Sequence, residues 1–99
     1  MSKRVYYKRS WLNKRHGKAF TIATVQKYEY KDLKKKHDRT EYESYYIIGD
    51  CSDDVELDFS IADLSDKKEV AKVKDKLKRF RENFAAFENK ILEEIDKGQ

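Results

Sequence analysis

The sequence predicts an α+β fold: a four-stranded antiparallel β-meander followed by one long C-terminal α-helix packed across one face of the sheet. Residues 1–61 are rich in Val, Ile, Tyr and Thr and are interrupted by polar turns, which favours strands. From residue 65 onward, apolar residues recur at steps of three and four, which indicates a helix. The 99 residues suffice for one domain, so we expect a single domain (1–99) with its sheet in residues 1–61 and its helix in residues 65–97.

Strand 1 is predicted over residues 4–12, where Val, Tyr and Trp suit a half-buried sheet surface. The polar residues 13–18 form a turn, in which Gly17 tolerates positive φ. The pattern leaves the buried face of this strand open between two sets of side chains, which are Val5, Tyr7 and Trp11, or Tyr6 and Leu12.

Strand 2 is predicted over residues 19–30 and strand 3 over residues 41–49. Strand 2 contributes Phe20, Ile22 and Val25 to the core, and the step of three from Ile22 to Val25 predicts a β-bulge or a strong twist. Residues 32–39, between these two strands, are predicted to be a basic loop or one helical turn.

Strand 4 has the clearest pattern in the chain. Val55, Leu57, Phe59 and Ile61 alternate with polar residues over residues 55–61. One face of this strand is therefore apolar and the other acidic, which is typical of an antiparallel sheet with one solvated side.

The long helix has recognisable ends. Ser65 or Asp66 is predicted to cap it, and Asp66 with Glu69 three residues later resembles a capping box, while Gly98 marks the end. At 1.5 Å per residue the helix would be ~48 Å long, about twice the ~23 Å of a seven-residue strand. We therefore expect it to extend beyond the sheet, to bend near Asn83, or to pack against a second copy of the chain.

The predicted core is small, so a homodimer through the helix would add stability. A parallel helix pair would place Lys76 against Arg81 of the other copy, and this seam is not matched in charge. The predicted core residues are Phe20, Ile22, Val25, Ile47, Val55, Leu57, Phe59, Ile61, Val70, Val73, Leu77, Phe80, Phe84 and Phe87.

The net charge of +4 conceals four blocks of alternating sign. Residues 1–40 hold 13 Lys and Arg against 3 acids, whereas residues 41–66 hold 9 acids and no base. Residues 67–81 carry 8 bases against 2 acids, and residues 82–99 carry 5 acids against 2 bases. Such segregation predicts an oriented surface field or charge pairing within the fold.

The sequence offers no constellation for catalysis or metal binding. His16 and His37 lie in predicted polar loops, without a partner that would orient a general base. Cys51 is alone and lies in an acidic turn, which disfavours a reactive thiolate and a disulfide. The aspartates of residues 50–54 lack the spacing of an EF-hand loop. We expect a cytoplasmic protein that is not an enzyme, has no cofactor and no metal, and does not enter a membrane.

The basic N-terminal block interleaves cations with aromatic rings. Single-stranded nucleic-acid sites need both, because cations follow the phosphates while bases stack on rings. The order of four strands and then one helix is also similar in topology to several small folds that bind single strands. We therefore predict a non-catalytic nucleic-acid-binding module with single strands as the favoured ligand. The predicted contacts are Lys8, Arg9, Trp11, Lys27, Tyr28, Tyr30, Lys31, Lys34, Lys35 and Lys36.

An alternative hypothesis is a small protein-interaction module, such as a regulator or inhibitor that docks on a larger protein. The segregated charge and the long helix favour it. Its contact surface would be the acidic face with Glu56 and Asp58, or the helix beyond Phe84.

Overall fold

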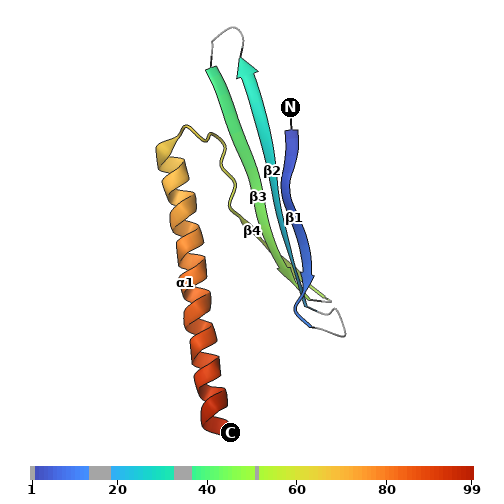
Figure 1. The fold of residues 1–99 in the computed structure, drawn as a ribbon, viewed down its shortest axis with the longest axis vertical. Coiled ribbons are helices and arrows are strands. Elements are labelled where there is room, and N and C mark those ends of the chain that lie inside the picture. The colour runs from blue at the N-terminus through green and yellow to red at the C-terminus, as the bar shows by residue number, and fades with distance from the viewer. Residues whose placement is uncertain (1, 14–18, 33–36, 51) are drawn as a thin grey trace.

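A computed structural model describes residues 2–13, 19–32, 37–50 and 52–99 and confirms the predicted α+β fold (Figure 1). Four antiparallel strands are hydrogen-bonded in sequence order, and one helix follows them. The elements are β1 (Ser2–Trp11), β2 (Phe20–Asp32), β3 (His37–Gly49), β4 (Asp54–Asp58) and α1 (Lys67–Gly98).

The hairpin between β2 and β3 is longer than predicted. Strand pairing continues through Tyr30 opposite Arg39 and Lys31 opposite Asp38, in the segment that was predicted to be a basic loop. A cation facing an acid and a cation facing a ring are favourable cross-strand pairs, so these polar residues support a ladder. Residues 33–36 lie outside the described residues.

The predicted β-bulge in strand 2 is wrong. β2 pairs with β3 without interruption, because Ile22 and Val25 belong to opposite faces of a regular strand. The irregularity lies in β1 instead, where the register shifts between Arg4 and Tyr6. The extra residue, Val5, brings Arg4 and Tyr7 to the same side of the sheet.

β4 is shorter than predicted, but its apolar alternation identifies the correct face. After β4 ends, the Phe59 N–H donates to the Ser44 carbonyl (2.8 Å). Ile61 exchanges both of its backbone hydrogen bonds with Tyr42 (2.8 Å each). Phe59 and Ile61 therefore continue the apolar side that begins in β4 and faces α1.

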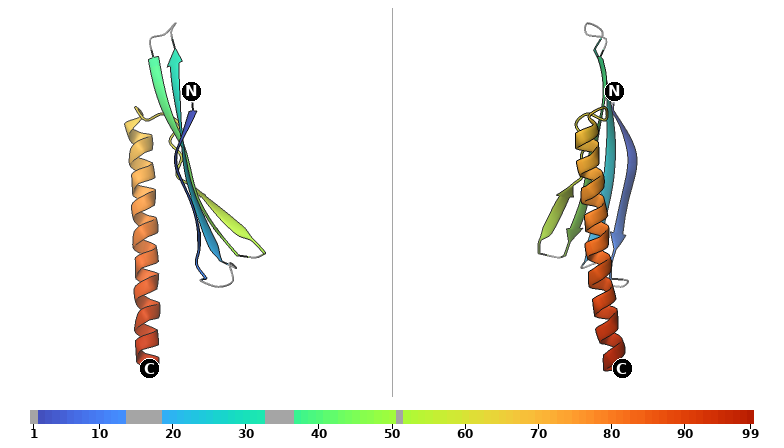
Figure 2. Two further views of the ribbon diagram at one scale, coloured as in Figure 1. Left: turned by 45° about the vertical axis from the view of Figure 1, so that its right-hand side comes forward. Right: turned by 90° about the vertical axis from the view of Figure 1, so that its left-hand side faces the viewer.

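Asp66 caps α1: its carboxylate accepts hydrogen bonds from the backbone N–H groups of Lys68 (3.1 Å) and Glu69 (3.2 Å). The Glu69 carboxylate accepts from the Asp63 N–H (3.0 Å), so it binds the connecting segment rather than the cap residue. The helix then continues for 32 residues and shows no bend near Asn83 (Figure 2). No helix in the described part of the chain is long and apolar enough to cross a membrane.

One aromatic cluster attaches α1 to the sheet. Phe59 is the only buried apolar side chain among the described residues, at 8% exposed. The ring of Phe80 lies 6.2 Å from that of Phe59 and 5.8 Å from that of Tyr46. The Lys76 ammonium lies 5.2 Å from the Phe59 ring and donates to the Asp58 carbonyl (2.6 Å). Beyond this cluster the helix diverges from the sheet and passes its end (Figures 1 and 2).

The prediction of a continuous core is therefore wrong. Phe84 and Phe87 do not line the groove beside the sheet and are 57% and 63% exposed, and Leu77 is 47% exposed. Val55 on the edge strand is 61% exposed. The physical reason is the separation of helix and sheet, which leaves a groove of about 410 Å³ between them. The other residues predicted for the core on the side of α1 are all partly exposed: Val25, Leu57, Ile61, Val70, Val73 and Phe80. Phe20, Ile22 and Ile47 were also predicted for this core, but the strand register places them on the opposite face of the sheet, away from α1.

Phe59→Ala should lower the free energy of unfolding by about 3 kcal/mol, because it removes the ring that joins helix and sheet. The matched control is Val55→Ala, on the same side of the same segment but exposed, which should cost less than about 1 kcal/mol. Urea unfolding followed by far-UV circular dichroism measures both. Equal losses in the two variants would contradict the role of Phe59.

Candidate nucleic-acid interface

The pleat and the register divide the side chains of the sheet into two faces. We call the face toward α1 the inner face; Tyr6, Ala23, Val25, Tyr46 and Phe59 from this face line the groove. The outer face points away from the helix. Its residues include Arg4, Tyr7, Arg9 and Trp11 of β1, Phe20, Ile22, Gln26, Tyr28 and Tyr30 of β2, and Arg39, Glu41 and Glu43 of β3.

At one end of the outer face, Arg9 lies over two aromatic rings. Its guanidinium carbon is 4.7 Å from the centroid of the Trp11 ring and 5.7 Å from that of Phe20. The two rings meet edge to face with centroids 5.9 Å apart, as their direct cross-strand pairing requires. This geometry is a cation–π cluster, and Trp11 remains 50% exposed.

Two further arginines repeat this arrangement. The guanidinium carbon of Arg4 lies 5.0 Å from the Tyr7 ring, and that of Arg39 lies 4.5 Å from the Tyr30 ring. Tyr30 also stacks on Tyr28, with ring centroids 6.4 Å apart and an interplanar angle of 14°.

The three arginines are evenly spaced. Arg9, Arg4 and Arg39 pair with Ile22, Gln26 and Tyr30, which are successive fourth residues of β2. At about 3.3 Å per residue their positions along β2 are about 13 Å apart, with Arg9 and Arg4 on one side of β2 and Arg39 on the other. None of the ion pairs between described residues involves these arginines. All three are exposed, so their free N–H groups can meet an anion.

Acidic residues border this face on the side of β3 and β4. The Tyr28 hydroxyl donates to the Glu43 carboxylate (3.4 Å), and the Tyr30 hydroxyl donates to that of Glu41 (3.3 Å). Partial burial and, second, the charge of Glu43 raise the pKa of Tyr28 above its usual value. Glu56 of β4 continues the acidic border through its pairing with β3. The outer face is thus basic at β1 and acidic at β4.

The structure brings together only part of the predicted contact set. Arg9, Trp11, Tyr28 and Tyr30 share the outer face. Lys8, Lys27 and Lys31 belong to the inner face, because each precedes or follows an outer-face residue in its strand. Lys34, Lys35 and Lys36 lie outside the described residues.

Lys27 also has an internal partner. Its ammonium lies 3.0 Å from the Glu29 carboxylate on the same side of β2. Hydrogen bonding between the two raises the pKa of Lys27 and lowers the pKa of Glu29. Lys27 therefore contributes less free positive charge than the sequence suggests.

The predicted set omits Arg4, Tyr7, Phe20 and Arg39 of the outer face. Arg4 and Tyr7 share a side only because of the bulge at Val5, for which the sequence carries no turn residue or glycine. Arg39 falls in the segment predicted as a loop. The sequence signal for Arg39 is the opposite charge of Lys31 and Asp38. These two residues pair across the strands and so extend the ladder past Arg39.

The remaining polar clusters are explained by local structure. The Asp50 carboxylate accepts hydrogen bonds from the backbone N–H groups of Ser52 (2.9 Å) and Asp53 (3.0 Å), which form a turn and lower the pKa of Asp50. Among the described residues, no three His, Cys, Asp or Glu side chains are placed to hold a metal ion. His16 and Cys51 lie outside the described residues.

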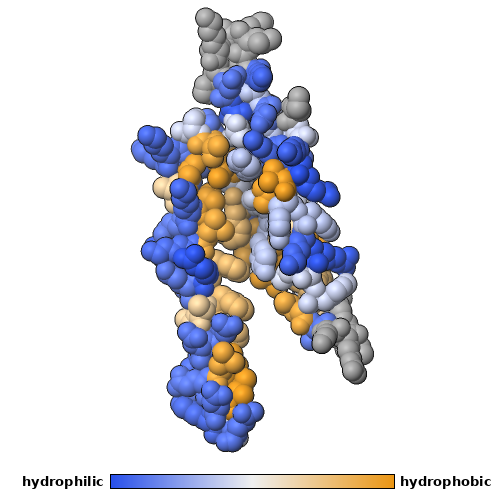
Figure 3. Space-filling view, viewed as in Figure 1, coloured by the Kyte–Doolittle hydropathy of each residue, from blue (hydrophilic) through white to orange (hydrophobic). Residues whose placement is uncertain are grey.

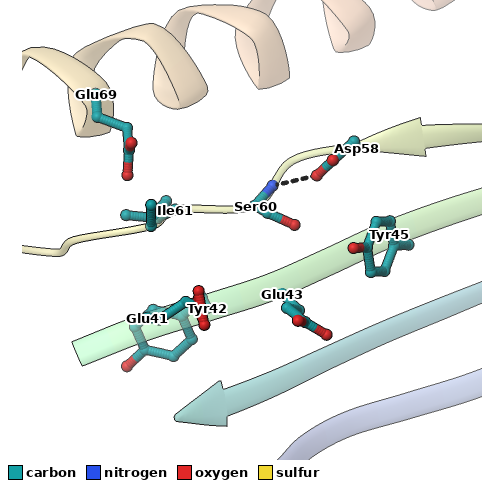
Figure 4. A pocket seen from close by; sticks show the side chains of 9 residues that line it. Glu41, Tyr42, Glu43, Tyr45, Asp58, Ser60, Ile61 and Glu69 are labelled. Atoms are coloured by element: carbon teal, nitrogen blue, oxygen red, sulfur yellow. Dashed lines mark hydrogen bonds between the residues drawn. The ribbon is translucent and has the colours of Figure 1, made fainter. Parts of the chain in front are cut away.

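An acidic hollow lies at the edge between β3 and the segment after β4 (Figure 4). It is lined by carboxylates that include Asp58 and Glu69. The Asp58 carboxylate accepts from the Ser60 N–H (2.8 Å), so it serves the bend at the end of β4. No protein-family model, curated protein or solved structure matches this chain, and function must be inferred from the surfaces themselves.

Asp58→Asn should reduce stability near neutral pH, with a loss that disappears in acid. The Ser60 hydroxyl and N–H, followed by the charge of Lys76, lower the pKa of Asp58 in the folded protein. Such a group stabilises above its unfolded pKa and loses this contribution as pH falls through the lowered folded pKa. Urea midpoints measured at about pH 6 and about pH 2 should therefore differ between the two proteins only at the higher pH.

Glu56→Gln, an exposed change on the same strand, is the control for Asp58→Asn and should leave the midpoint nearly unchanged at both pH values. A deficit for Asp58→Asn that stays constant down to about pH 2 would contradict the assignment.

Proposed function

We propose that the protein is a non-catalytic nucleic-acid-binding module that favours single strands and binds them across the outer face of its sheet. The observation that supports this most strongly is the set of three arginines at intervals of about 13 Å along the strand direction, each set against an aromatic ring. A single strand offers the matching pattern, since its phosphates repeat along one edge and its bases are free to stack.

The exposed rings supply the base contacts in this proposal. Trp11, Tyr7 and Tyr30 are 50%, 48% and 42% exposed. Stacking of one base on an aromatic ring contributes roughly 1–3 kcal/mol and is tolerant of sequence. Bases inside a duplex have their faces covered by their neighbours, so these rings favour single strands.

The charge distribution supports a path along β1 and β2. Arg4 and Arg9 lie on β1, and Arg39 lies at the far end of β3, whereas Glu41 and Glu43 of β3 and Glu56 of β4 form the acidic side. Phosphates approaching the acidic side would be repelled. The bound strand therefore follows the basic side, in contact with Arg4 and Arg9, and reaches Arg39 at the far end of the hairpin.

A docking role on another protein draws on a different surface. The observation that favours it is the apolar C-terminal half of α1, where Phe84 and Phe87 are more than half exposed. That surface and the outer face lie on opposite sides of the sheet, so the two roles are compatible.

Arg9→Glu should weaken binding of a fluorescent single strand of about 12 nucleotides by at least about 10-fold, because it reverses charge within the arginine row. Lys8→Glu is the matched control: it makes the same change in net charge one residue away on the inner face, and should weaken binding less than about 3-fold. Fluorescence anisotropy measures both affinities.

For the wild-type protein, three phosphate contacts predict a slope of about −2 in log affinity against log salt. Trp11 is the only tryptophan, so base stacking should quench its emission. Binding that is insensitive to salt, or an equal effect of the Lys8 and Arg9 variants, would overturn the proposal.

A further inference from the structure

The chain exposes more surface than a folded monomer of its mass. Its accessible area is 8562 Å², whereas a compact protein of 11.9 kDa exposes about 6,000 Å². The excess of about 2,600 Å² is well above the ~800 Å² that one partner buries in a standard interface. The radius of gyration, 18.1 Å, likewise exceeds the ~13 Å of a compact domain of this length.

Much of the exposed apolar surface is continuous along one side of α1. Val73, Leu77 and Phe80 line the groove against the sheet. The same stripe then continues past the sheet through residues that are all 46–63% exposed, Phe84, Phe87, Ile91 and Ile95. Figure 3 shows apolar side chains in the space between helix and sheet and again near the C-terminal end of the helix. A helical end of this length is marginal in water without packing.

The distribution of charge along α1 favours an antiparallel second copy of the chain as its partner. Residues 67–81 carry a net charge of +6 and residues 82–99 a net charge of −3. Two parallel copies would set like charges side by side, whereas two antiparallel copies set each basic half beside an acidic half. We propose that the protein forms a homodimer in which the α1 helices pack antiparallel and the C-terminal half of each fills the helix–sheet groove of the other.

In one antiparallel register, the apolar residues between Val73 and Ile91 face apolar residues of the other copy. Phe84 meets Phe80 of the partner subunit, Leu77 meets Phe87 of the partner subunit, and Ile91 meets Val73 of the partner subunit. Each contact occurs twice by the two-fold symmetry. The partner's Phe87 and Ile91 thereby enter the groove that is incomplete in one chain.

The polar flanks of this register are mostly complementary. Lys74 lies beside Glu88 of the partner subunit, and Glu69 lies beside Lys97 of the partner subunit. Lys76 lies beside Lys90 of the partner subunit, and Arg81 lies beside Arg81 of the partner subunit, so these two like-charge contacts offset part of this gain. Because this surface lies away from the outer face, dimerisation is independent of nucleic-acid binding.

The oligomeric state of the full chain tests the proposal. Sedimentation equilibrium at about 50 µM should show a dimer. Phe87→Glu should raise the dimer dissociation constant at least about 100-fold, because it places a charge in the seam. The matched control Ala86→Glu adds the same charge on the polar side of the same turn and should leave the dimer intact. Far-UV circular dichroism checks that both variants remain folded.

Disulfide formation tests the orientation. Two variant chains are mixed and oxidised, one with Leu77→Cys and the other with Phe87→Cys. Both carry Cys51→Ser, and one of them carries a mass tag. Antiparallel packing predicts cross-links between the two different chains, whereas parallel packing would link each chain to its own kind. Three results would overturn the proposal: a monomeric wild-type protein, cross-links between chains of the same kind, or equal dissociation of the Phe87 and Ala86 variants. If the protein is a monomer, the groove would instead bind an apolar ligand or a different protein.

Discussion

Phe59 holds the helix to the sheet, and the other contacts on that side of the fold are arranged around it. Its ring contacts Phe80 and Lys76 of α1. It is also the only buried apolar side chain in the described part of the chain. The Asp66 cap and the hydrogen bond from Leu64 N–H to the Thr40 carbonyl place the start of the helix over β3. With one end fixed in this way, the helix crosses the inner face once and continues beyond it.

This attachment gives the sheet two different surfaces, an inner face beside the helix and an outer face open to solvent. The helix packs only on the inner face, so the outer face is not covered and exposes Trp11, Tyr7 and Tyr30. The bulge at Val5 is what aligns the outer face, because it reverses the alternation of β1 between Arg4 and Tyr6. Without that one residue, Arg4 would point toward the helix, and the row of three arginines would be interrupted.

The sequence predicted those elements whose patterns are local. The alternation from Val55 to Ile61 identified the inner face of β4, and the cap was narrowed to Ser65 or Asp66, of which the structure uses Asp66. Alternation alone separates Lys8 from Arg9, but it does not tell which of the two faces the helix. That depends on pairing with β2 and on the bulge at Val5, for which the sequence has no signal. The exposed core could not be predicted either, since periodicity reports which side of a helix is apolar and says nothing about how closely that side approaches a sheet.

The most direct test of this division is nuclear magnetic resonance of the isotope-labelled full chain titrated with a short single-stranded oligonucleotide. We predict shift changes that alternate along β1, large at Tyr7, Arg9 and Trp11 and small at Tyr6 and Lys8, with further changes at Tyr28, Tyr30 and Arg39. Changes confined to α1, or equal on both faces of β1, would contradict the assignment of the outer face as the binding surface.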